Sequence, residues 1–125
     1  MTALTFVLLS VAGGVGAALR LMLDGIIRSR SQGIMPWGTI TINVTGSLLL
    51  GLLTGLATAH LMPEAWHLVV GSGFLGGYTT FSTASFETIR LLQERRWLIG
   101  LSNGLGTLIC ATSAAGLGLG VGTLL

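Results

Sequence analysis

The chain has 125 residues, of which 51% are hydrophobic and only 8% are charged, and its formal net charge is +2. A soluble globular domain carries about 25% charged residues, so this composition lacks the polar surface that water requires. The basic residues are six scattered arginines, and their small excess argues against a nucleic-acid-binding protein.

Four apolar runs are long enough to cross a bilayer, which takes about 20 residues. They cover residues 3–23, 38–60, 65–92 and 97–123, and the third contains an expected break near residues 76–80. No basic residue precedes the first run and three more follow it, which argues against a cleaved signal peptide. We therefore expect one all-α membrane domain of four transmembrane helices.

Small residues recur every four positions on three of the expected helices. They are Gly13 and Ala17 in the first helix, Ser47, Gly51 and Gly55 in the second, and Gly100 and Gly104 in the fourth. Such stripes let helix backbones approach closely inside a membrane. They serve either packing within one bundle or an interface between subunits, and the sequence leaves both open.

The stretch GFLGGYTTFST, residues 73–83, interrupts the third apolar run. Its glycine pair at 76–77 weakens the helix, and four of the five residues from 79 to 83 carry hydroxyls. Non-helical backbone at membrane depth persists only where it is buried in protein or lines a polar cavity. Freed carbonyls at such a break can coordinate a cation, and freed N–H groups and hydroxyls can hold an anion. We therefore expect an ion site here.

Two other polar residues lie within the apolar runs and need partners at membrane depth. Asn43 lies several residues inside the second run, where its amide serves either an ion or a hydrogen bond between helices. Glu87 lies beyond the expected break. It is either a functional residue or a residue near the interface that pairs with an arginine such as Arg90.

Three motifs resemble the signatures of the Fluc/CrcB fluoride channel family. They are GGVGAALR (13–20), WGTITINVTGS (37–47) and GFLGGYTTFST (73–83), and the resemblance covers nearly the whole chain. It implies a passive, fluoride-selective channel of the plasma membrane that exports fluoride from the cytoplasm. It further implies an antiparallel dimer with two pores along its interface and a structural sodium ion at its centre.

The resemblance also implies roles for individual residues. Backbone carbonyls of Gly76 and Thr79 match those that hold the sodium ion, and Arg20 matches a structural arginine of the first helix. The residues that match positions at or near the fluoride pore are Asn43, Thr80, Phe81, Ser82, Thr83 and Glu87. A pore for strongly hydrated fluoride must replace water with donors, which the amide and hydroxyls supply, and the positive edge of an aromatic ring can face an anion.

The chain departs from the family pattern at Ala84. The family motif continues TTFSTF, whereas this chain reads TTFSTA, so a second ring is missing. Phe86 does not replace it, because positions 81 and 86 lie about 140° apart on a helix, against about 60° for 81 and 84. Asn103 stands where some relatives carry a tyrosine. These departures affect the pore lining and leave the fold unchanged.

The arginines are distributed unevenly between the two sides of the membrane. All six lie at or near the connections that follow the first and third helices, which favours a single orientation with both termini outside. An antiparallel homodimer needs both orientations, so a heterodimer, or a non-conducting partner subunit of another chain's pore, stays open.

A small multidrug-resistance-type antiporter would need a carboxylate in the first helix, and no acidic residue precedes Asp24. The sequence contains no cluster of metal-ligating residues, so it does not predict an enzyme.

Overall fold

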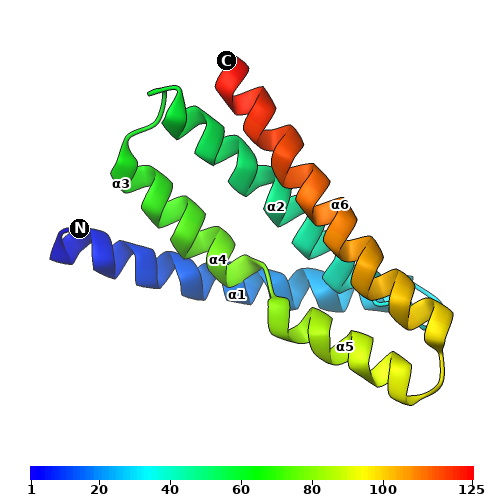
Figure 1. The fold of residues 1–125 in the computed structure, drawn as a ribbon. Helices are drawn as coiled ribbons and strands as arrows, with labels where there is room; N and C mark the ends of the chain where they lie inside the picture. Colours follow the sequence, from blue (N-terminus) through cyan, green and yellow to red (C-terminus); the bar gives the residue numbers. More distant parts are fainter.

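A computed structural model describes residues 1–125, which form helices and no strands. The unbroken helices are α1 (Ala3–Arg30), α2 (Trp37–Thr58) and α6 (Trp97–Leu124). Between α2 and α6 lie shorter pieces: α3 (Glu64–Trp66), the π-helical segment η1 (His67–Leu75), α4 (Gly76–Tyr78) and α5 (Phe81–Gln93). These pieces follow one another as a single bent rod, with the bend between α4 and α5 (Figure 1).

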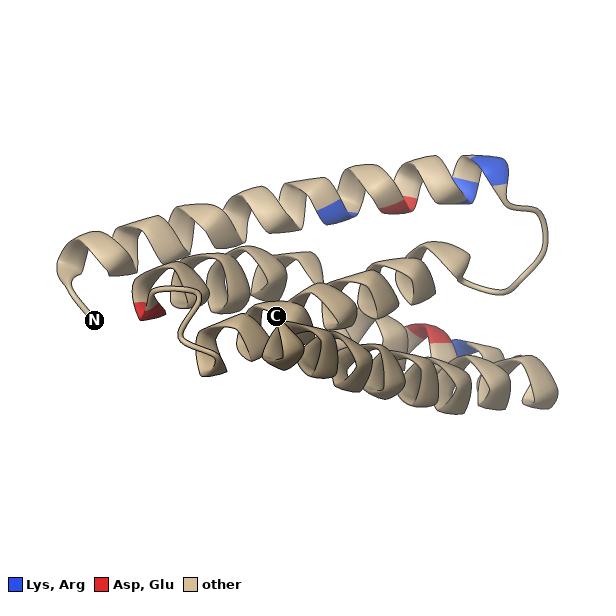
Figure 2. Ribbon diagram, turned by 90° about the horizontal axis from the view of Figure 1, so that it is seen from above, with Lys and Arg blue, Asp and Glu red and all other residues tan.

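The chain is a multi-pass membrane protein of the all-α class, as predicted. Helices α1, α2 and α6 are each long and apolar enough to cross a membrane, and most of their large apolar side chains point outward. The bent rod from α3 to α5 accompanies them as the fourth member of the bundle (Figure 1). The basic residues lie toward the end of the bundle where α1 turns into α2 (Figure 2).

Helix α1 continues to Arg30, past the predicted end of the first apolar run at residue 23. Two features extend it. Asp24 and Arg28 form an ion pair of 3.0 Å one turn apart, which supports a helix locally. Arg28 and Arg30 lie in the last turn, where positive charge interacts favourably with the helix dipole.

Glycines set the closest contacts between helices. Helices α2 and α6 pack backbone to backbone, so that a Cβ on Gly51 would overlap the carbonyl oxygen of Ala115. Likewise, a Cβ on Gly118 would overlap the carbonyl oxygen of Leu48. The glycines of the predicted stripes, at positions 13, 51, 55, 100 and 104, all have neighbours from other helices of the same chain. The stripes therefore serve packing within one bundle.

The break in the third crossing lies at Thr79 and Thr80, inside the predicted range, and both have extended backbones with ψ of 160° and 122°. The glycine pair expected to weaken the helix is itself helical, in α4. Gly77 instead allows close approach, because a Cβ there would overlap the carbonyl oxygen of Gly13 in α1. Helix α5 then restarts with Thr80 as its N-cap.

His60, just after α2, has a left-handed backbone with φ of 60°. The bonds from its N–H to Ala57 O (3.1 Å) and from Leu61 N–H to Leu56 O (2.9 Å) form a helix ending that favours glycine. We expect His60→Gly to raise the free energy of unfolding by about 0.5–1 kcal/mol, because a Cβ in this conformation costs about 1–2 kcal/mol and glycine entropy offsets part of the gain.

Thermal unfolding in mild detergent measures this change, with His60→Ala as the control that keeps a Cβ. The alanine variant should not be stabilised. Equal stabilisation of both variants would show that the imidazole, and not the backbone conformation, is responsible.

Candidate functional site

An open cleft of about 490 Å³ lies between α2, α5 and α6, beside the break. Its lining includes Asn43 of α2, Thr79 and Thr80 of the break, and Phe81 at the start of α5. The remaining lining mixes apolar side chains such as Leu50 with glycines and with polar side chains such as Ser47 and Asn103. The structure thus brings together four candidate residues that come from two separate sequence motifs.

Asn43 is half-buried, and both ends of its amide bind the backbone of Thr80. Its Nδ2 donates to the carbonyl oxygen of Thr80 at 2.8 Å, and its Oδ1 accepts the N–H of Thr80 at 2.8 Å. An amide nitrogen carries two hydrogens, so one donor remains for a ligand in the cleft. The hydrogen bond between helices that the sequence left open is present, and it goes to the backbone of the break.

The hydrogen bonds at the break redirect two backbone donors. In a continuous α-helix, the N–H of Thr80 would donate to Gly76 O and the N–H of Thr83 would donate to Thr79 O. Here the N–H of Thr80 donates to Asn43, and the N–H of Thr83 donates to Thr80 Oγ1 at 3.2 Å. The carbonyl oxygens of Gly76 and Thr79 have therefore lost their usual helical donors and are available to a ligand.

Arg20 of α1 holds the other flank of the break. Its Nε donates to the carbonyl oxygen of Gly77 at 3.2 Å, and none of the ion pairs in the structure involves it. A guanidinium within a membrane-spanning segment needs a protein partner. Its bond to Gly77 supplies one and fixes α4 against α1.

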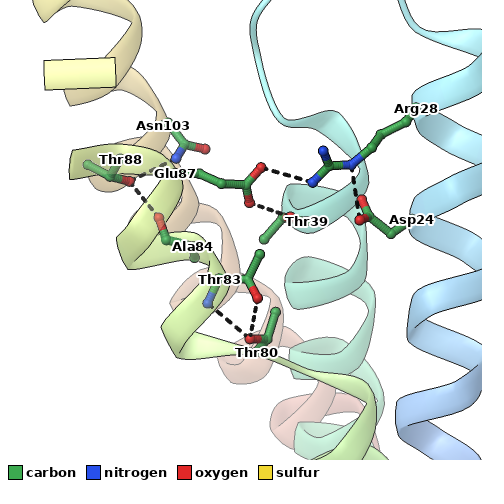
Figure 3. Close-up of polar contacts among 9 residues, drawn as sticks. All are labelled: Asp24, Arg28, Thr39, Thr80, Thr83, Ala84, Glu87, Thr88 and Asn103. Atoms are coloured by element: carbon green, nitrogen blue, oxygen red, sulfur yellow. Dashed lines mark hydrogen bonds and ion pairs between the residues drawn. The ribbon is translucent and has the colours of Figure 1, made fainter. Parts of the chain in front are cut away.

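Glu87 lies outside the cleft, in a polar cluster that joins three helices (Figure 3). Its side chain is buried, and its Oε1 accepts from Thr39 Oγ1 of α2 at 2.6 Å. Its Oε2 accepts from Arg28 Nη2 of α1 at 3.3 Å, and Arg28 also pairs with Asp24. The partner of Glu87 is thus Arg28, and not the suggested Arg90, because Arg28 reaches across from the last turn of α1.

A known protein family matches the part of the chain that holds the cleft, the break and the Glu87 cluster. The family profile described as "CrcB-like protein, Camphor Resistance (CrcB)" matches residues 7–119, which include the cleft, the break and the Glu87 cluster. The chain belongs to the CrcB family. This confirms the resemblance carried by the three sequence motifs.

Relatives of this CrcB chain carry a functional name. This chain is 52% identical to "Fluoride-specific ion channel FluC 1" of Leifsonia xyli subsp. xyli, over 99% of this chain and 90% of that protein. This chain is 44% identical to FluC 1 of Streptomyces avermitilis, over 89% of this chain and 86% of that protein. It is also 44% identical to FluC 2 of Cutibacterium acnes, over 96% and 98%.

Phe81 and two further candidates of this CrcB chain, Ser82 and Thr83, lie at the start of α5. Phe81 is 87% exposed in the single chain, so its ring at the edge of the cleft is free to contact another molecule. Ser82 is exposed and Thr83 is half-buried, and neither lines the cleft. Their hydroxyls lie 3.4 Å and 3.2 Å from Thr80 Oγ1, which they surround.

Ala84 lines the same cleft and is connected to α6 by a short chain of hydrogen bonds (Figure 3). The buried Asn103 donates from Nδ2 to Thr88 Oγ1 at 2.8 Å, and Thr88 donates to the carbonyl oxygen of Ala84 at 2.8 Å. With alanine at position 84, a methyl group lines the cleft there, and the carbonyl oxygen of Ala84 is paired with Thr88.

The sequence of this CrcB chain did not single out Thr107 as a residue of the cleft, or Thr39 and Arg28 as partners of Glu87. Thr107 lines the cleft with a buried Oγ1 that has no hydrogen-bond partner. Its spacing of four from Asn103, which places both on one face of a helix, was the available signal. Thr39 and Arg28 meet Glu87 only through tertiary contacts, which spacing along the chain does not reveal.

Proposed function

We propose that this chain forms a fluoride-selective channel that lets fluoride leave the cytoplasm passively across the plasma membrane. One observation carries the proposal. The third crossing breaks beside a cleft where Asn43 Nδ2 keeps one free hydrogen, in a chain 52% identical to a protein named as a fluoride-specific ion channel. Passive movement down a gradient requires no catalytic residue.

The cleft offers groups that suit a small, strongly hydrated anion. The remaining hydrogen of Asn43 Nδ2 is a donor that replaces water. The positive edge of the Phe81 ring faces an anion while its apolar body excludes bulk water. In this proposal Ser82, Thr83 and Glu87 serve the approaches to the cleft, since they lie outside its lining.

We further propose that the break holds a structural sodium ion. The carbonyl oxygens of Gly76 and Thr79 suit it, because unwound carbonyls of broken membrane helices coordinate Na⁺. When bound, the cation raises the local potential for anions. Two carbonyls do not complete its coordination shell, which supports a second subunit that contributes the others.

The second subunit we propose is antiparallel and covers the exposed Phe81 and the open cleft. A second copy of this chain satisfies this arrangement, whereas the one-sided arginines favour a different chain of opposite orientation. A non-conducting partner subunit is the alternative that the lost ring at Ala84 supports. A small multidrug-resistance-type antiporter is not supported, because Asp24, the only acidic residue of α1, pairs with Arg28.

Efflux from liposomes that contain only the purified chain tests the channel. With a potassium ionophore present, vesicles loaded with potassium fluoride should release fluoride, and those loaded with potassium chloride should retain chloride. Equal rates for the two anions would contradict the proposal. Dependence on an opposing proton gradient would indicate an exchanger instead. Silence of the pure chain, with flux restored by a co-expressed second subunit, would identify the partner-subunit alternative.

A further inference from the structure

The geometry points to a second role for Asn43, beyond donating to an anion. We infer that Asn43 is the positioning residue that holds the break open and exposes the carbonyl oxygens of Gly76 and Thr79. The consequence for sodium and transport rests on the proposed function, whereas the role in the break itself does not.

The backbone N–H and C=O of Thr80 both need hydrogen-bond partners at membrane depth. The residue before α1, α2 or α6 bonds its carbonyl to an N–H four positions ahead. The carbonyl of Thr80, before α5, instead accepts from Asn43 Nδ2. The N–H of Thr80 is also held by Asn43. One side chain thus replaces both helical partners of this residue.

Two acceptors, Gly76 O and Asn43 Oδ1, compete for the N–H of Thr80. In a continuous helix this N–H would return to Gly76 O, and the break would close. Because Asn43 Oδ1 accepts it at 2.8 Å, Gly76 O is left free. With Thr80 held in an extended conformation, its hydroxyl caps α5 by accepting the N–H of Thr83, which in turn frees Thr79 O.

The amide of Asn43 couples the cleft to the break. Asn43 faces the cleft and also determines which carbonyls of the break are free. Arg20 supports α4 from the α1 side through Gly77 O, but it does not contact Thr80. Removal of Asn43 should therefore alter the break even when no anion is present.

Hydrogen exchange followed by mass spectrometry, on the full chain in detergent micelles, tests this inference. We expect Asn43→Leu, which removes both bonds, to speed exchange in the peptide that covers residues 76–83 by about tenfold. The upward shift of the melting temperature by sodium, relative to potassium, should be lost in the same variant. Asn103→Leu is the matched control, because it removes another amide of the same cleft that does not contact the break.

Unchanged exchange and an unchanged sodium shift in Asn43→Leu would overturn the inference. If this variant does not fold, Asn43→Asp decides, because it keeps an acceptor for the N–H of Thr80 but repels its carbonyl, and intermediate exchange is expected. A variant that loses fluoride flux while its break stays protected would make Asn43 a ligand only, and the inference wrong. Failure of the wild type to conduct fluoride, alone and with a second subunit, would refute the proposed function, and the exchange comparison would still test the break.

Discussion

Gly118→Ala is expected to lower the free energy of unfolding by about 3 kcal/mol or more, enough to reduce the yield of folded protein sharply. The added Cβ would overlap the carbonyl oxygen of Leu48 and would lie 2.8 Å from the N of Leu52. Both are backbone atoms of α2, which cannot rotate away as a side chain does. The two helices must therefore separate. Chemical unfolding in mild detergent measures the loss.

Gly116→Ala is the matched control on the same helix. A Cβ at Gly116 meets nothing within 4 Å in the chain, and alanine is a better helix former than glycine by about 1 kcal/mol. This variant should therefore be at least as stable as the wild type. Equal losses for both variants would show that glycine content, rather than contact between α2 and α6, sets the stability of α6.

Arg28→Gln is expected to destabilise the folded protein by about 1–2 kcal/mol, because it leaves the buried carboxylate of Glu87 without its cation. The full cost of breaking a buried pair is larger, but the Arg28 side chain is 55% exposed, and solvent screens the interaction. The hydrogen bond from Thr39 to Glu87 then remains. We also expect slower fluoride flux, since an uncompensated negative charge near the pathway repels anions.

The double variant Arg28→Gln/Glu87→Gln separates pairing from general effects of losing an arginine. It should be destabilised less than the sum of the two single variants, and its flux should return toward that of the wild type. Arg30→Gln, two residues away and outside every ion pair, should change stability by less than about 0.5 kcal/mol. If Arg28→Gln costs the same with and without Glu87, the two groups are not coupled.

The sequence predicted the fold well where hydrophobicity decides the structure. Apolar runs located the membrane helices, and the polar residues after Gly77 located the break to within a few positions. The length of α1 was underestimated, because its last turns depend on an ion pair and a helix dipole rather than on hydrophobicity. Whether the small-residue stripes pack within or between subunits depends on helix rotation, which spacing leaves undetermined.

The site was predictable only as a set of residues. Motif spacing singled out Asn43 and Thr80, but that one amide binds both backbone groups of Thr80 follows from the packing of α2 against the break. The same limit applies to Glu87, whose partner lies 59 positions away in sequence. Residue type shows that a polar group needs a partner at membrane depth, and only the three-dimensional arrangement shows which partner it has.

The unequal lengths of the helices tie this protein to the thickness of its bilayer. The 28 residues of α1 span about 42 Å and the 22 residues of α2 about 33 Å, against a hydrocarbon layer of about 30 Å. We therefore expect α2 to fit this layer closely and the charged last turns of α1 to reach the headgroups. We therefore expect the cluster of Arg28, Thr39 and Glu87 to lie where headgroups meet acyl chains. Lipids with longer acyl chains would draw these charges into hydrocarbon, so the stability of the folded chain should fall as the lipid tails lengthen.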